Sequence, residues 1–193
     1  METAQLYPHP ATPCPHSLDL IARFERPSPD RIRLRYELSG SLSQLLIPAQ
    51  DPIPERLDGL WQHLCFEAFL KPSSKQGYWE FNISPSGDWA IYRFDGYRDN
   101  MTSPQINTAP TLQINHNQSG TGAVLNLTLE IELTQLDDAL SQSDLQLSLT
   151  SVIETQGGDL SYWAHHHPAE KPDFHHPDGF VLHLPPSLTE KSP

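Results

Sequence analysis

The chain has 193 residues, of which 37% are apolar, and its formal net charge is -12. A chain of this length buries roughly 70% of the surface that it exposes when unfolded, so it can form the core of one domain. The acidic balance repels phosphate backbones and anionic membrane surfaces, and it therefore argues against nucleic acid and membrane lipids as partners.

The two ends of the chain are rich in proline and serine, and we expect residues 1–16 and 185–193 to flank the folded domain. The first stretch, METAQLYPHPATPCPHS, has neither the basic start nor the apolar run of a secretory leader. No later run approaches the roughly 20 apolar residues of a transmembrane helix. We therefore expect a cytoplasmic protein with its domain at residues 17–184 and with its two cysteines as free thiols.

Alternation of apolar and polar residues predicts most of the domain as strands, because successive side chains of a strand point to opposite faces. Residues 31–38 (RIRLRYEL) and 122–133 (GAVLNLTLEIEL) alternate most clearly. Residues 64–70 (LCFEAFL) are nearly all apolar, which is typical of a strand buried on both faces. The other predicted strands lie at residues 17–25, 42–47, 78–84, 88–94 and 144–154, after the Gly157-Gly158 turn, and at 179–184.

Turn and helix signals complete the prediction of the fold. Pro85-Ser86-Gly87 marks a turn between two strands, and the one helical pattern is short, at residues 134–141, with Thr134 as its N-cap. About nine short strands and at most one short helix predict an all-β fold, an antiparallel β-sandwich of jelly-roll type. Long loops at residues 48–60, 96–111 and 165–178 are where we expect function to lie.

The familiar catalytic signatures are missing from the sequence. It contains no G-x-S-x-G motif, no phosphate-binding loop and no G-x-G-x-x-G motif. Two cysteines also cannot supply the usual thiolate zinc site. We therefore expect a protein that is not an enzyme, and we assign it no cofactor.

A histidine-rich loop is the most unusual segment. Imidazole and carboxylate groups together suit zinc, copper or nickel, but adjacent histidines of an extended segment point in opposite directions and cannot all bind one ion. The segment is therefore a candidate metal site in which only some of these groups can share one ion, and the alternative is a polar loop that faces solvent. The segment contains His165, His166, His167, Asp173, His175, His176 and Asp178.

Aromatic residues are interleaved with polar groups along the predicted strands. Sugars stack their C–H faces on aromatic rings, while carboxylate, amide and guanidinium groups bind their hydroxyls. The alternative is that most of the rings fill the core, where aromatic side chains contribute strongly to burial. The rings are Trp61, Trp79, Trp89, Tyr92, Tyr97, Tyr162 and Trp163, and the polar groups near them are Glu67, Asn82, Arg93 and Asp95.

Glu67 is the most informative of these polar groups, because it interrupts the apolar strand at residues 64–70. A buried carboxylate needs a partner. Arg93 lies in a neighbouring predicted strand, and we expect it to be that partner, in a pair that serves stability, binding or both.

Four segments of the chain carry a family resemblance. They are WQHLCFEAFL (61–70), YWEFNISPSGDWAIYRFDGYR (78–98), SYWA (161–164) and HPAEKPDFHHPDGF (167–180). Together they resemble a bacterial DOMON-like domain, a group similar to family-nine carbohydrate-binding modules, over about residues 17–184. The resemblance implies a jelly-roll sandwich and a ligand-binding role, with relatives that bind sugars or haem.

The resemblance also implies a set of ligand-binding residues. Aromatic rings clasp the sugar in sugar-binding relatives. His165 and His166 depart from the family pattern, which leaves His167, Asp173 and His175 as the metal candidates, with His176 also family-like. The implied function is binding of a carbohydrate or of a small molecule that contains one. The alternatives are haem binding through Met101 and a histidine, metal binding by residues 165–178, and a protein-interaction domain with an unknown partner. The ligand-binding candidates are Trp61, Glu67, Asn82, Trp89, Arg93, Tyr97 and Trp163.

Overall fold

The computed structural model describes residues 1–107, 109–119 and 122–186. Its strands are β1 (Glu2–Pro8), β2 (Leu18–Ser28), β3 (Arg31–Gly40), β4 (Cys65–Pro72), β5 (Tyr78–Ile83), β6 (Trp89–Phe94), β7 (Thr111–Ser119), β8 (Gly122–Glu132), β9 (Leu145–Glu154), β10 (Leu160–Ala164) and β11 (Leu182–Leu184). Short 3-10 helices are η1 (Leu42–Gln44), η2 (Leu60–Gln62), η3 (Leu133–Gln135), η4 (Asp138–Gln142) and η5 (Pro177–Gly179). No helix of the described part is long and apolar enough to cross a membrane.

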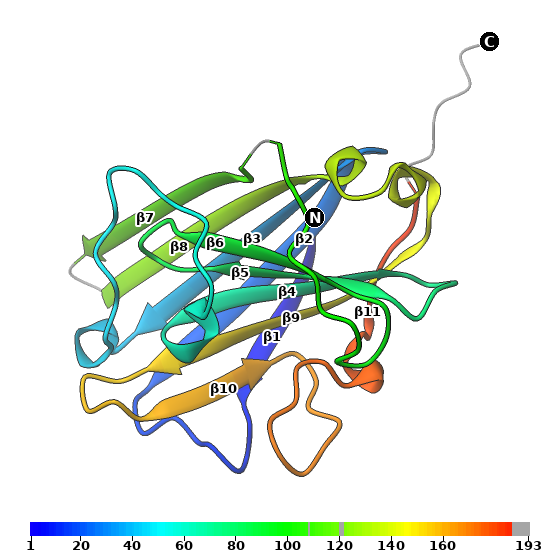
Figure 1. Ribbon diagram of the computed structural model, residues 1–193. Coiled ribbons are helices and arrows are strands. Elements are labelled where there is room, and N and C mark those ends of the chain that lie inside the picture. Colours follow the sequence, from blue (N-terminus) through cyan, green and yellow to red (C-terminus); the bar gives the residue numbers. More distant parts are fainter. Residues whose placement is uncertain (108, 120–121, 187–193) are drawn as a thin grey trace.

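The strands form one antiparallel sheet that curls back on itself. The order is β6-β5-β4-β9-β10-β1-β2-β3-β8-β7, and β11 pairs with β9. Figure 1 shows the curled sheet as two layers, with β4, β5, β6, β9 and β10 in front of β2, β3, β7 and β8. Strand β1 pairs with both β10 and β2, and so connects the layers. This arrangement confirms the predicted all-β, sandwich-like class, while the jelly-roll connectivity stays a prediction.

The core lies between the two layers and follows the predicted alternation. Leu125, Leu127, Leu129 and Ile131 of β8 are buried, as expected. The front layer contributes side chains that include Phe66, Ala68, Leu70, Trp79, Phe81, Ile91, Leu147 and Leu149. Because the inner side chains of each strand recur every second residue, the residues between them must lie on the outer faces.

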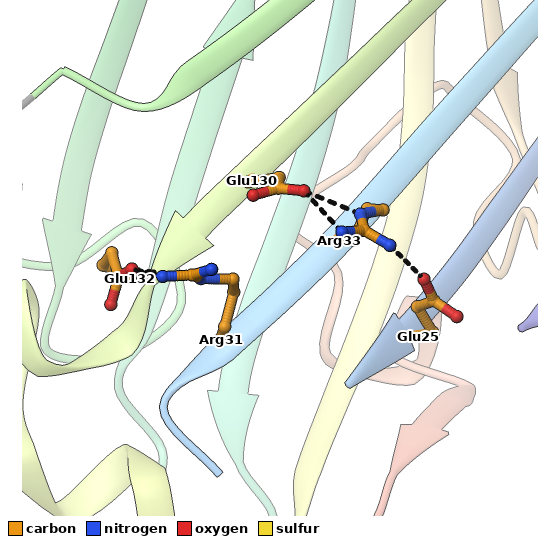
Figure 2. Close-up of polar contacts among 5 residues, drawn as sticks. All are labelled: Glu25, Arg31, Arg33, Glu130 and Glu132. Atoms are coloured by element: carbon orange, nitrogen blue, oxygen red, sulfur yellow. Dashed lines mark hydrogen bonds and ion pairs between the residues drawn. The ribbon is translucent and has the colours of Figure 1, made fainter. Parts of the chain in front are cut away.

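The outer faces of the two layers differ in character. On the back layer, Arg33 bridges Glu25 and Glu130 at 2.8 and 2.7 Å, and Arg31 pairs with Glu132 (Figure 2). These side chains are partly exposed, as on a solvated sheet face. On the front layer both faces of β4 and β5 are buried, which confirms the prediction from the apolar run at residues 64–70. Loops therefore cover the front face.

Four expectations about local structure are wrong. Residues 2–8 form β1, because Ala4 and Leu6 alternate into the core despite the nearby prolines. Residues 111–119 form β7, although no strand was expected there. Residues 42–47 contain η1 and a single bridge from Leu45 in place of a strand. Residues 134–141 contain parts of η3 and η4, in which Asp137, and not Thr134, caps a helix. Residues 187–193 of the expected C-terminal segment lie outside the described residues.

Candidate functional site

A cavity of about 820 Å³ opens on the covered outer face of the front layer. Its floor comes from β4, β5, β6, β9 and β10, and its walls come from loops. Each of the three long loops expected to carry function contributes to the wall. The lining residues are Asp58, Gly59, Trp61, Gln62, Glu67, Glu80, Tyr92, Phe94, Arg98, Met101, Ser103, Val152, Tyr162, Pro172, Phe174 and His175.

Two carboxylates stand on the floor because of the alternation along β4 and β5. Phe66 and Ala68 point into the core, so Glu67 between them points outward. Trp79 and Phe81 on β5 also point into the core, so Glu80 between them points outward as well. In the register of the two strands Glu67 is opposite Asn82, and Phe69 is opposite Glu80. The two carboxylates are therefore diagonal neighbours on one face.

A row of polar atoms without partners crosses the floor through Glu67. Thr150 on β9 and Asn82 on β5 flank Glu67 on either side. Glu67 Oε1, Asn82 Oδ1 and Thr150 Oγ1 are buried and have no hydrogen-bond partner within the described part of the chain. Asn82 Nδ2 donates to Glu80 Oε1 at 2.8 Å, which directs the Asn82 carbonyl away from Glu80. Buried polar atoms are nearly always paired, and Glu67 is the member of this row that lines the cavity, so a bound molecule can supply a partner to its Oε1.

Burial controls the charge of the floor. It raises the pKa of Glu67 well above its ordinary value, and the neighbouring charge of Glu80 raises it further. Burial also raises the pKa of Glu80 to about 7, against the opposing effects of the Asn82 hydrogen bond and the Arg98 charge. Near neutral pH the empty floor therefore does not carry two full negative charges.

His175 closes one side of the cavity as a neutral ring. Tyr78 Oη accepts a hydrogen bond from the Arg98 backbone N–H at 3.3 Å and lies 2.7 Å from His175 Nδ1. His175 Nε2 lies 3.8 Å from Glu80 Oε2, so the two ring nitrogens face Tyr78 and Glu80. Burial, and then the charge of Arg98, lower the pKa of His175 to about 4. The ring is therefore uncharged at neutral pH.

Polar contacts hold the loops over the floor. Asp173 accepts hydrogen bonds from Tyr97 Oη at 2.7 Å and from Arg98 Nη2 at 2.9 Å, which joins the loop after β6 to the loop before η5. Tyr92 Oη donates to Asp58 Oδ1 at 2.8 Å and joins β6 to the segment before η2. The walls are thus fixed by contacts between segments that are far apart in the sequence.

The predicted ligand-binding residues divide between the cavity and the core. Trp61 is 49% exposed and lines the cavity together with Glu67, while Asn82 lies beside Glu67 on the floor and Tyr97 holds the rim. Trp89 and Trp163 are 8% and 3% exposed and belong to the core between the layers. The expectation that these two rings clasp a ligand is wrong, because their positions alternate onto the inner face.

The expected pair of Glu67 and Arg93 is also wrong. Arg93 is opposite Trp79 in the strand register, and its guanidinium lies 5.6 Å from the centroid of that ring. Arg93 Nη1 also donates to the Tyr78 carbonyl at 3.3 Å. Trp79 belongs to the inner face and Glu67 to the outer one, so the sheet separates the two groups that sequence proximity suggested.

The histidine loop does not assemble a metal site. His167 Nε2 lies 2.9 Å from the Tyr7 carbonyl on β1, whereas Asp173 and His175 make their contacts at the cavity rim. His165 also contacts the β1 backbone, at the Gln5 carbonyl. Within the described ranges no group of three His, Cys, Asp or Glu side chains is placed to hold a metal ion. The metal hypothesis on His167, Asp173 and His175 is therefore wrong.

The residues do not fit a haem group either. Met101 and His175 both line the cavity, and His175 is the one histidine among its described lining residues. Nδ1 of His175 contacts Tyr78 Oη at 2.7 Å, and the Glu80 carboxyl group lies 3.8 Å from Nε2, where a haem iron would have to approach the ring. The buried carboxyl groups of Glu67 and Glu80 would also face the apolar macrocycle.

Sequence reasoning missed two central members of the site. Glu80 was not singled out, although its position in YWEFNI alternates in the same way as that of Glu67. Asp58 lies in a loop without a periodic pattern, so only the folded chain brings it to Tyr92. His175 was singled out, but as a metal ligand.

Comparisons with known proteins bear on the fold. No family model matches the chain, and no curated protein sequence matches it. A crystal structure of a protein from Bacteroides uniformis, named as a candidate carbohydrate-binding protein, is similar, with a TM-score of 0.63 and 15% sequence identity. The match covers 93% of this chain and 84% of the other. At this identity the likeness shows a shared fold, and the DOMON-like resemblance stays a prediction.

Proposed function

We propose that this protein binds a carbohydrate, or a small molecule that contains one, in the cavity on the front layer and does not catalyse a reaction on it. The observation that carries the proposal is the combination of aromatic walls with a floor of unpartnered polar atoms. Sugars present apolar C–H faces and hydroxyl groups, so they match both surfaces. The volume of about 820 Å³ falls within the roughly 300–1,000 Å³ usual for ligand pockets.

The comparison with the Bacteroides uniformis protein supports this proposal through its fold and its name. The bacterial DOMON-like resemblance and a cytoplasmic location are parts of the same proposal. Trp61 is the ring best placed for stacking, because it lines the cavity while remaining 49% exposed.

The test is a calorimetric titration of the purified protein with a panel of mono- and disaccharides, repeated for Trp61→Ala. We expect the variant to lose at least about tenfold in affinity, by analogy with nucleobases, whose stacking on an aromatic side chain is worth about 1–3 kcal/mol. Its melting temperature should stay unchanged. Tyr7→Ala removes a ring that is 56% exposed and lies outside the cavity lining, and it should keep full affinity. Absence of binding to every sugar would refute the proposal.

A further inference from the structure

The charges around the cavity do not balance. Asp58, Glu67 and Glu80 are its carboxylates, and Arg98 is the one permanent cation among its described lining residues. The guanidinium of Arg98 is already paired with Asp173 at 2.9 Å. His175 adds no charge at neutral pH, because its ring is neutral. The cavity therefore has more carboxyl groups than permanent cations, and Glu67 and Glu80, which are not both fully charged when the cavity is empty, can release a proton when a cation binds.

The unpartnered atoms of the floor are mainly hydrogen-bond acceptors. Glu67 is only 3% exposed and Asn82 is fully buried, and Glu67 Oε1 and Asn82 Oδ1 both lack a donor within the described residues. Asn82 Nδ2 donates to Glu80 Oε1, so rotating the Asn82 amide to offer a donor elsewhere would break this hydrogen bond. Of the three unpartnered residues Glu67 lines the cavity, so a donor on a bound ligand can reach Glu67 Oε1, whereas Thr150 Oγ1 is a hydroxyl that can itself donate.

Aromatic rings surround these acceptors. Tyr92, Phe94 and Tyr162 stand on the strands of the floor, and Trp61 and Phe174 belong to the walls. The face of an aromatic ring attracts a cation within about 6 Å of its centroid, and cages of such rings bind alkylated ammonium groups. The same walls would accept the C–H faces of a sugar ring.

We infer that the ligand of this cavity carries an ammonium group, as an amino sugar does, and that Glu67 and Glu80 bind this group on the floor. An ammonium offers three N–H donors and a positive charge, which answers both the unpartnered acceptors and the unbalanced carboxylates. A neutral hydroxyl answers only the first, and a sugar phosphate would be repelled. The inference rests on the proposed function for the sugar part of the ligand and on the floor for the amine.

The experiment is a set of calorimetric titrations at pH 7 with D-glucosamine, N-acetyl-D-glucosamine, D-glucose and methylammonium. Glucosamine should bind at least about tenfold more tightly than glucose or the N-acetylated sugar, because these lack the charge that strengthens hydrogen bonds to carboxylates. Glu67→Gln and Glu80→Gln should each remove about tenfold of the affinity for glucosamine. Both variants keep the shape of the side chain and should leave binding of glucose within about twofold.

The matched control is Glu132→Gln, which removes a carboxylate of the back layer (Figure 2) and should leave every affinity unchanged. Equal binding of the three sugars would overturn the ammonium inference and leave the proposed carbohydrate function standing. Binding of methylammonium without any sugar would support the ammonium site and overturn the carbohydrate function. Failure of all four probes to bind would overturn both.

Discussion

The carboxyl group of Glu80 should make the folded protein less stable as the pH rises toward neutrality. Burial raises its pKa from 4.5 to about 7, so between these values the folded state keeps a proton that the unfolded state has lost. Its contribution is fully present below pH 4.5 and is lost as the pH rises through 7. The difference between the two pKa values corresponds to about 3 kcal/mol in the free energy of unfolding.

The substitution Glu80→Gln isolates this effect. Glutamine is neutral at every pH, and its carbonyl can still accept the hydrogen bond from Asn82 Nδ2. At pH 4.5 the variant and the natural protein should be about equally stable. At pH 8 the variant should be more stable by about 3 kcal/mol, because it avoids the burial of a charge. A residue kept for binding at the expense of stability has this signature.

His175 acts with the opposite sign, which is why the difference between two proteins must be measured. Its pKa is lowered from 6.5 to about 4, so the unfolded state binds more protons between these values and stability rises with pH there, also by about 3 kcal/mol. The two effects oppose each other in the natural protein between about pH 4.5 and 6.5. The contribution of His175 is present in both proteins, so it cancels when the free energy of unfolding of one is subtracted from that of the other.

Urea unfolding at pH 4.5, 5.5, 6.5, 7.5 and 8 measures the difference, provided that the slope with urea stays the same in both proteins. Glu132→Gln serves as the reference for the loss of a partly exposed carboxylate, and it should cost less than about 1 kcal/mol. If the difference between Glu80→Gln and the natural protein varied by less than about 0.5 kcal/mol across these pH values, the raised pKa of Glu80 would be refuted.

Two further predictions concern the two faces of the sheet. Leu129→Ala should cost about 2–5 kcal/mol of unfolding free energy, because this side chain is buried in the core. Thr128→Ala, on the outer face of the back layer, should cost less than about 1 kcal/mol. Equal costs of the two variants in urea unfolding would argue against the assigned register. Trp163→Ala should cost about 3–5 kcal/mol of unfolding free energy, whereas Trp61→Ala should leave the thermal melt nearly unchanged. An unchanged melting temperature of Trp163→Ala would contradict the place of this ring in the core.

The sequence alone determined the fold class and the inner faces of the strands. Alternation in GAVLNLTLEIEL placed its leucines in the core, and the apolar run around Glu67 indicated a strand buried on both sides. These features are local, because the direction of a side chain relative to its neighbours follows from the geometry of one strand. The same logic failed for β1, where prolines concealed a short alternating pattern.

Only the tertiary structure decided which polar groups meet. Sequence proximity suggested that Arg93 pairs with Glu67, but strand pairing put Arg93 beside Trp79 and placed Thr150, Asn82 and Glu80 around Glu67. The loops then brought His175 over Glu80 from a distant part of the chain, while His167 was directed to β1. Register and loop closure depend on the packing of the whole chain, so no local pattern encodes the neighbours of a buried carboxylate.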